Sequence, residues 1–387
     1  MSYVDEKAAP RREERLGTCV DFGGCACDLK KKFNGGCLQN NDRGFCQGSI
    51  CQLLPGLSML NTIPDSVVIV HGSLGCGGAG HSQSAAVRGR QILSGSTNPR
   101  GTLWLSTNLN EKDVVAGGEV KLEEAIIEAD RRYRPASIIV VASCVPGIIG
   151  DDLEGVVAKV QSQVNGKILL VHCEGFKTKV MATAYDAVYH AISRSLLEFD
   201  KDEERIYKDE IEEAAEKIRR SKRVNLMNVS SGTLGDEKEL TRLLNALGLE
   251  AKIFPCYAHP EDMKYATEAA LSISTCPTHD DYFLKYLKEK FNVPYLLRYM
   301  PIGIQNTNSW IREVAKFFHL EEEAERLIER ETAELELALK PIRENLKGKK
   351  AMLSAGEVRT LATAVWLKEL GMEVVAVRPY HYDEFGE

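Results

Sequence analysis

The stretch SVVIVHGSLGC, residues 66–76, decides the fold class. In it, a short run of β-branched apolar residues ends at glycines, and similar runs return as ASIIVVASC (136–144) and KILLVHCEG (167–175). Between the first two of these runs lies KLEEAIIEADRRY (121–133), which has the apolar spacing of an amphipathic helix. Short apolar strands that alternate with helices are typical of βαβ units on a buried parallel sheet. We therefore predict an α/β domain over residues 61–200.

Two further series of the same kind follow. The second series predicts a domain over residues 201–320, with its clearest strands at 223–229, 250–256 and 271–276. The third series has a charged helix, the strand KKAMLSA (349–355), another helix and the strand MEVVAVRP (372–379). Because two strands make an incomplete sheet, we expect residues 321–387 to start a domain that continues past the last residue. The predicted fold is α/β, with three doubly wound, Rossmann-like parallel-sheet domains, the third truncated at its C-terminus.

Residues 1–60 are predicted to form a separate, Cys-rich N-terminal segment. Residues 1–15 are charged and are expected to fray, and residues 16–55 show neither helical nor alternating periodicity. This stretch holds six of the eleven cysteines: Cys19, Cys25, Cys27, Cys37, Cys46 and Cys51. An additional metal site, an extra ligand near Cys51 and a loop of free thiols remain alternatives for the first five. Their C-x-C spacing is not that of a zinc ribbon.

The charge balance and hydropathy exclude some classes of function. The chain carries 49 Lys and Arg against 56 Asp and Glu, a net charge of -7, which argues against binding nucleic acid through bulk positive charge. No apolar run reaches the ~18–20 residues that a membrane span needs, and the polar start has no signal-peptide core. We therefore expect a cytoplasmic protein. Because disulfides are rare in the cytosol, its cysteines point to metal or redox chemistry.

The remaining cysteines recur at the carboxyl ends of predicted strands, where open α/β sheets bind their ligands. They are Cys76, Cys144, Cys173, Cys256 and Cys276. A buried apolar thiol is the alternative for each one. The glycine-rich segment HGSLGCGGAG (71–80) lacks the GK[ST] of a nucleotide-binding loop. Glycines there, such as Gly77, would let the backbone approach a bulky anionic group, with a plain tight turn as the alternative.

Several segments together carry a family resemblance. They are Cys51, HGSLGC ending at Cys76, TNLNEKDVVAGGEVKLEEAI (107–126), SCVPGIIGDDLEGV (143–156) and HCEGFK (172–177). In this order they resemble the nitrogenase component 1 family, specifically its α-type subunits and their scaffold relatives. The resemblance implies that Cys51, Cys76 and Cys144 ligate an 8Fe-7S, P-cluster-like cluster shared with a homologous β (K-type) subunit in an α2β2 complex. Thiolates are the ligands that iron–sulfur clusters take.

The resemblance also implies an active site. It places Cys276 at one end of a nitrogenase-type metallocluster of unspecified heterometal, with a histidine beyond Glu387 as the opposite ligand. Electrons would come from an ATP-hydrolysing 4Fe-4S reductase. Arg359, which follows a predicted strand end, is a candidate to steady an anionic part of this cofactor, with an exposed salt bridge as the alternative. Candidate polar groups of the pocket are His81, Gln83 and His279, although surface or capping positions are weighed equally.

Three positions depart from the family pattern, one of which is Ser84, where dinitrogen-reducing α subunits carry an arginine. Where dinitrogen-reducing α subunits carry glutamine and histidine after the CEGF motif, this chain has Met181 and Tyr185. Neither side chain repeats proton donation by an imidazole near neutral pH. We therefore interpret the chain as the catalytic α subunit of a nitrogenase-like reductase resembling methylthio-alkane reductase, which cleaves C–S bonds of small thioethers. The alternatives are a scaffold for cofactor assembly and a true nitrogenase α subunit.

Overall fold

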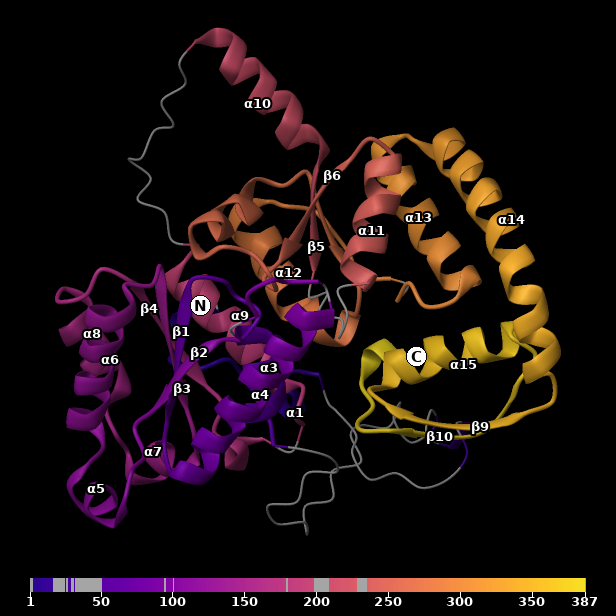
Figure 1. Cartoon of the computed structure of the whole chain (residues 1–387). Coiled ribbons are helices and arrows are strands. Elements are labelled where there is room, and N and C mark those ends of the chain that lie inside the picture. Colours follow the sequence, from indigo (N-terminus) through magenta and orange to yellow (C-terminus); the bar gives the residue numbers. More distant parts are fainter. Residues whose placement is uncertain are drawn as a thin grey trace.

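The computed structural model describes residues 3–16, 25, 27–28, 31, 51–93, 95–99, 101–178, 180–197, 209–227, 235–298 and 300–386. Within these residues the chain forms three sheets, with strand orders β2-β1-β3-β4, β6-β5-β7-β8 and β10-β9 (Figure 1). Each strand pairing in this part of the chain is parallel. The prediction of an α/β fold with parallel sheets is confirmed. The predicted domain boundaries stay predictions.

The first sheet lies between two layers of helices. Its strands are β1 (Ser66–His71), β2 (Leu103–Ser106), β3 (Ser137–Ala142) and β4 (Lys167–His172). Because successive strand residues face opposite sides, Val68 and Val70 pack with α3 and α9, whereas Val67 and Ile69 pack with α6 and α8. The helices around this sheet are α3 (Leu53–Leu60), α4 (Leu74–Leu93), α5 (Glu111–Ala116), α6 (Glu119–Tyr133), α7 (Cys144–Ile149), α8 (Leu153–Gln161), η2 (Gly175–Lys177) and α9 (Thr183–Ser195).

The second sheet is also covered on both faces. Its strands are β5 (Arg223–Met227), β6 (Glu250–Phe254), β7 (Leu271–Ser274) and β8 (Tyr295–Leu296). Val224 and Leu226 pack with Trp310 in a core formed by α11, α13 and α14. On the opposite side Phe254 stacks on Phe283 of α12, with ring centroids 5.1 Å apart. The associated helices are α10 (Glu210–Lys222), α11 (Gly235–Ala246), η3 (Pro260–Glu268), α12 (Pro277–Phe291), α13 (Ile304–Phe318) and α14 (Glu321–Leu346).

The third sheet is small and half-exposed. It consists of β9 (Lys350–Ala355) and β10 (Glu373–Pro379), with α15 (Glu357–Glu369) between them in sequence and η4 (Glu384–Gly386) after them. α15 lies between this sheet and α13, so the third sheet reaches the second through the helices that cover one face of the second (Figure 1). In the described part of the chain, no helix combines the length and the apolar character needed to cross a bilayer.

The N-terminal residues pack against the body of the protein, so the expectation that residues 1–15 fray was wrong. η1 (Tyr3–Asp5) and α1 (Arg12–Arg15) lie along α9 and α12. Arg12 is fully buried and donates a 2.8 Å hydrogen bond to Asp186 of α9. Arg15 donates to Asp281 of α12 at 3.0 Å. Partners so distant in sequence give no local signal. Of the other N-terminal cysteines, Cys25 and Cys27 are exposed, and Cys19, Cys37 and Cys46 lie outside the described residues.

Candidate functional site

Three of the predicted metal ligands lie near the carboxyl edge of the first sheet. Cys76 is in the first turn of α4, after β1, and Cys144 begins α7, directly after β3. β1 and β3 are hydrogen-bonded neighbours, so these two cysteines follow adjacent strand ends. Cys51 lies two residues before α3, and its carbonyl accepts a 3.1 Å hydrogen bond from the Leu54 N–H. The fold thus brings a cysteine before the sheet to two cysteines that follow its strands.

Gly175 shows how close two of these sulfurs are. A Cβ added at Gly175 would lie 2.6 Å from Cys51 Sγ and 3.7 Å from Cys144 Sγ, so both sulfurs face the same short piece of backbone. Burial raises the pKa of the Cys51 thiol, and the charges of Cys144 and Cys76 raise it further. Cys51 is exposed and the other two are half-buried. The three thiols therefore form one cluster that faces the protein surface.

The other strand-end cysteines of the first two sheets, Cys173 and Cys256, occupy a different environment. Neither has any exposed surface, and both belong to one hydrophobic core. Burial raises the pKa of the Cys173 thiol far above its ordinary value. A Cβ added at Gly56 would lie 2.8 Å from Cys173 Sγ, so α3 packs directly on this sulfur. The environment of both fits the alternative of a buried apolar thiol.

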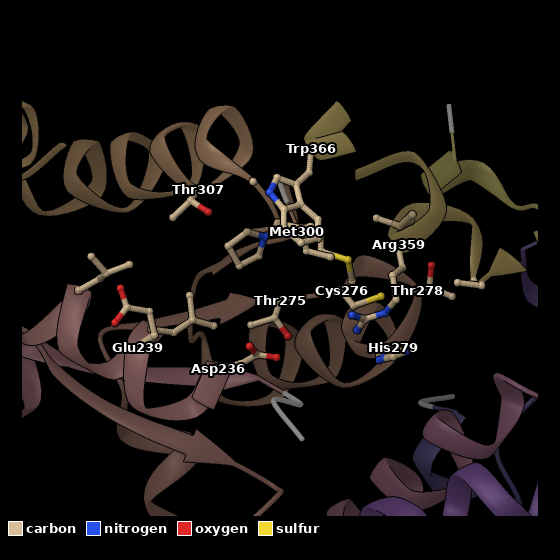
Figure 2. A pocket seen from close by; sticks show the side chains of 18 of the residues that line it. Asp236, Glu239, Thr275, Cys276, Thr278, His279, Met300, Thr307, Arg359 and Trp366 are labelled. Carbon is tan, nitrogen blue, oxygen red and sulfur yellow. The ribbon is translucent and has the colours of Figure 1, made fainter. Parts of the chain in front are cut away.

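A cavity of about 1120 Å³ lies beside Cys276. Cys276 is the N-cap residue of α12, follows β7 and is 4% exposed. Its N–H donates a 3.0 Å hydrogen bond to Ser274 Oγ, which holds the turn between strand and helix. Figure 2 shows Cys276 grouped with Met300, Arg359 and His279 on the cavity wall. Burial, with the nearby Asp280 carboxylate, raises the pKa of Cys276 to about 12, and the Arg359 guanidinium opposes this shift.

Besides Cys276, four residues that the sequence analysis singled out line the same cavity, namely Met181, Tyr185, His279 and Arg359. The Tyr185 ring packs on the His279 ring with centroids 3.8 Å apart and planes tilted by 33°. Burial lowers the pKa of His279 well below its ordinary value, and the Arg359 charge lowers it further, so the imidazole is neutral at neutral pH. Burial likewise raises the pKa of the Tyr185 phenol, which stays protonated. The wall thus combines a thiol, a neutral imidazole, a phenol and a guanidinium.

His81, Gln83 and Gly77 lie elsewhere, on α4. Of the described residues that line the cavity, none belongs to this helix. His81 is exposed and meets the edge of the Trp104 ring at a centroid distance of 6.0 Å, and Gln83 is half-buried. A Cβ at Gly77 would lie 2.7 Å from Ser106 Oγ, so close packing of α4 on β2 is sufficient reason for a glycine there. The catalytic and cofactor-binding roles of these three residues stay predictions.

Part of the cavity wall was missed from the sequence. Met300, Trp366 and His381 also line the cavity. Beside His381 lie the buried carboxylates of Glu357 and Asp383, and one ligand atom from each of these three residues falls within 4.8 Å of the others. A signal was present, because Glu357 and His381 each stand two residues after a strand end, where α/β sheets bind ligands. In the sequence analysis, strand-end position singled out the cysteines and Arg359, but not these three residues.

Comparison with known proteins shows which family this chain resembles in sequence. A family model described as "Nitrogenase component 1 type Oxidoreductase" matches residues 51–384. The chain is 31% identical over 365 residues to the nitrogenase iron-molybdenum cofactor biosynthesis protein NifE of Rippkaea orientalis, covering 91% of this chain and 71% of that protein. It is 25% identical over 391 residues to the nitrogenase molybdenum-iron protein alpha chain of Methanothermobacter thermautotrophicus, covering 99% and 76%.

A solved structure supports the same relationship. The structure described as "Nitrogenase Cp1 at pH 5" matches with a TM-score of 0.72 and 25% identity, over 86% of this chain. The match spans 65% of that structure's chain, just under two thirds of its length. The shared architecture is the α/β fold with parallel sheets described above. Because the family model covers most of its length, the chain belongs to the family of nitrogenase component 1 type oxidoreductases.

Proposed function

We propose that this chain is the α-type, catalytic subunit of a nitrogenase-like reductase. Cys51, Cys76 and Cys144 would hold an iron–sulfur cluster, and Cys276 would hold an active-site metallocluster. The observation that carries the proposal is the placement of four of the described cysteines, three in a surface-facing cluster and one buried beside a cavity of about 1120 Å³. Each of the three sheets would be the centre of one doubly wound domain.

The first site suits a cluster that two subunits share. Its three thiols are exposed or half-buried, so a partner subunit can reach the same group. The absence of a side chain at Gly175 leaves room beside Cys51 Sγ and Cys144 Sγ. Three thiolates from one chain leave iron coordination for the partner to complete. We propose an 8Fe-7S, P-cluster-like cluster, with a homologous β subunit in an α2β2 complex.

The second site suits a metallocluster enclosed by protein. The Cys276 thiol has a pKa of about 12 in this environment, and a bound metal would hold it as the thiolate. Arg359 shares the cavity and brings a positive charge that can offset an anionic cofactor. The residues do not specify its heterometal. Because the Cys276 side chain is buried, its thiolate would interact more strongly with nearby charges than it would in bulk water.

The described residues bind and orient a small apolar substrate. Met181, Met300 and Trp366 supply apolar wall, and a thioether sulfur makes favourable contacts with such groups. The protonated Tyr185 phenol and the neutral His279 imidazole can hold protons at the same wall. A bound metallocluster would supply the electron-transfer chemistry. Two electrons, from an ATP-hydrolysing 4Fe-4S reductase, and two protons would convert a thioether R–S–CH3 into R–H and methanethiol.

A second candidate function is that of a scaffold on which a nitrogenase cofactor is assembled. The observation that favours it is the 31% identity to a protein named for cofactor biosynthesis, against 25% to an alpha chain. A scaffold would use the same cysteines but would hand its cluster to another protein. Dinitrogen reduction is the third alternative, and Met181 and Tyr185 in place of glutamine and histidine argue against it.

Iron content tests the two thiol sites. The chain is co-expressed with its partner subunit and purified without oxygen, and iron is measured in the variants Cys144→Ala and Cys276→Ala. We expect Cys144→Ala to lose the interface cluster and Cys276→Ala to lose the active-site cluster alone. Cys173→Ala and Cys256→Ala are the matched controls, because both remove a buried thiol at a strand end. Iron that is unchanged in both of the first two variants would refute the proposal.

Turnover separates the candidate functions. The complex is supplied with its reductase and ATP, and with a methyl thioether, dinitrogen or acetylene. A reductase should release methanethiol from the thioether, and the Cys276→Ala variant should not. A scaffold should release no product and should transfer its cluster to an acceptor that lacks one. Ammonia from dinitrogen would instead support a true nitrogenase α subunit.

A further inference from the structure

A second kind of ligand set lies against the cavity wall. It consists of Glu357 in the first turn of α15 and His381 and Asp383 after β10, all buried, with exposed fractions of 1%, 4% and 0%. His381 Nε2 lies 3.5 Å from Glu357 Oε1 and 3.7 Å from Asp383 Oδ2. These atoms therefore converge on one point inside the protein.

Several polar atoms of this set lack a partner. Among the described residues, neither ring nitrogen of His381 has a hydrogen-bond partner, and Asp383 Oδ2 has none either. Buried polar atoms are nearly always hydrogen-bonded or bound to a metal, because leaving them unpaired costs about 1–3 kcal/mol each. Of these unpaired atoms, His381 Nε2 and Asp383 Oδ2 face each other at 3.7 Å. Such an arrangement is typical of side chains that converge to bind a ligand between them.

The charges around the set favour a cation as that occupant. The nearest guanidinium, that of Arg12, lies 3.8 Å from Asp383 but is bound more closely by Asp186, at 2.8 Å. The two buried carboxylates of the set, Glu357 and Asp383, thus have only part of the positive charge of Arg12 near them. In keeping with this, burial and the Asp383 charge raise the pKa of Glu357 well above its ordinary value. Burial lowers the pKa of His381 to about 4, so its imidazole is neutral, as a metal ligand must be.

We propose that Glu357, His381 and Asp383 form a binding site for one divalent transition-metal ion. Ligand atoms about 2.0–2.2 Å from a tetrahedral ion are roughly 3.3–3.6 Å apart, close to the two separations measured from His381 Nε2. One imidazole with two carboxylates suits Zn²⁺, Fe²⁺ or Mn²⁺ better than the softer copper ions or Ca²⁺. With three protein ligands, a tetrahedral ion keeps its fourth coordination position for water or for a group in the cavity.

Neighbouring groups already orient the ligands. Thr278 Oγ1 donates to Glu357 Oε1 at 3.2 Å, and the Asp383 N–H donates to Glu357 Oε2 at 2.8 Å. The Phe385 N–H donates to Asp383 Oδ1 at 3.0 Å, which leaves Oδ2 facing the centre. Outer hydrogen bonds of this kind are typical of metal sites, and losing one usually lowers metal affinity about 10–100-fold. None of these ligands is a cysteine, although His381 lines the same cavity as Cys276, so metal binding here can be measured separately from iron at the thiols.

Titration with Mn²⁺ tests the site. The full-length chain in complex with its partner is treated with a chelator, and free Mn²⁺ is followed by room-temperature EPR, where iron–sulfur clusters give no signal. We expect each chain to remove one Mn²⁺ from solution and to release it on addition of Zn²⁺, which binds such sites more tightly. His381→Gln and Asp383→Asn should weaken binding more than about 100-fold, and Thr278→Val about 10-fold.

Controls make each outcome decisive. His259→Gln removes a half-exposed histidine that lies 3.8 Å from Asp65 and should bind Mn²⁺ as the wild type does. Cys276→Ala should also leave Mn²⁺ binding unchanged, even if its iron content falls. If His381→Gln does not fold, Asp383→Asn gives the same comparison, because an asparagine oxygen can still accept from Phe385. No uptake by the wild type, or equal uptake by Asp383→Asn, would mean that a shared proton occupies the site, and would overturn the proposal.

Discussion

Replacing Gly175 with alanine probes the surface-facing thiol cluster directly. The new Cβ would lie 2.6 Å from Cys51 Sγ, about 1 Å closer than an ordinary contact. Without a cluster, the Cys51 side chain can rotate away at a cost of roughly 0.5–1.5 kcal/mol. With a cluster bound, the sulfur is fixed to within about 0.2 Å, so a displacement of 1 Å breaks the bond. We expect Gly175→Ala to lose most of the interface-cluster iron while the protein remains folded.

Two measurements on each variant read out this effect. Iron per chain and low-temperature EPR are recorded on the anaerobic complex, and urea unfolding is recorded on the cluster-free chain. Gly78→Ala is the matched control, because its Cβ meets nothing within 4 Å although it stands two residues from Cys76. Because alanine favours the helix more than glycine does, the Gly78→Ala variant should have a free energy of unfolding about 0.5–1 kcal/mol higher than the wild type and the same iron content. Wild-type iron content in Gly175→Ala would refute the proposed position of the cluster.

Two further predictions concern groups outside both thiol sites. Arg12→Met should lower the free energy of unfolding by about 3 kcal/mol or more, because it removes a positive charge from the buried Asp186 carboxylate. The control Arg11→Ala, at an exposed side chain, should change that free energy by less than about 0.5 kcal/mol. Equal losses of unfolding free energy for the two variants in urea would contradict this prediction. Burial lowers the pKa of His190 to about 4 in the folded state, whereas an unfolded histidine has a pKa of about 6.5. Between these two pH values the unfolded chain binds a proton that the folded chain does not, so the free energy of unfolding should fall as pH falls from about 6.5 to about 4. The difference in unfolding free energy between wild type and His190→Gln should therefore change across that pH range, and a constant difference would show that His190 is not responsible.

The sequence predicted the buried strands well because their signal is local. Residues 67–70 and 138–142 are continuous apolar runs, and the strands that contain them are fully buried. β2 was missed because LWLS (103–106) is a short strand with no buried residue, which gives it little periodicity. The helix α4 was missed for a related reason, since its glycines carry no helical signal. The burial of Arg12 was not predicted, because its partners Asp186 and Asp281 are distant in sequence and give no local signal.

The candidate site was predictable where one rule applied and hidden where it depended on packing. Strand-end position singled out Cys276, and the family resemblance added Met181 and Tyr185, all of which line the cavity. The same rule also selected Cys173 and Cys256, and only burial in the core separates them from the proposed ligands. Glu357 shares no sequence motif with His381 and Asp383, because most of α15 and all of β10 separate them, and strand-end position was the one signal that Glu357 and His381 carried.

An anomalous difference map recorded at the iron absorption edge tests the central claim most directly. The crystals would contain the anaerobically purified complex of this chain with its partner subunit. We predict iron peaks within bonding distance of the sulfurs of Cys51, Cys76 and Cys144, and a separate group of peaks at the sulfur of Cys276. A map in which these sulfurs have no iron beside them, from protein never exposed to oxygen, would contradict the proposal that this chain holds two clusters.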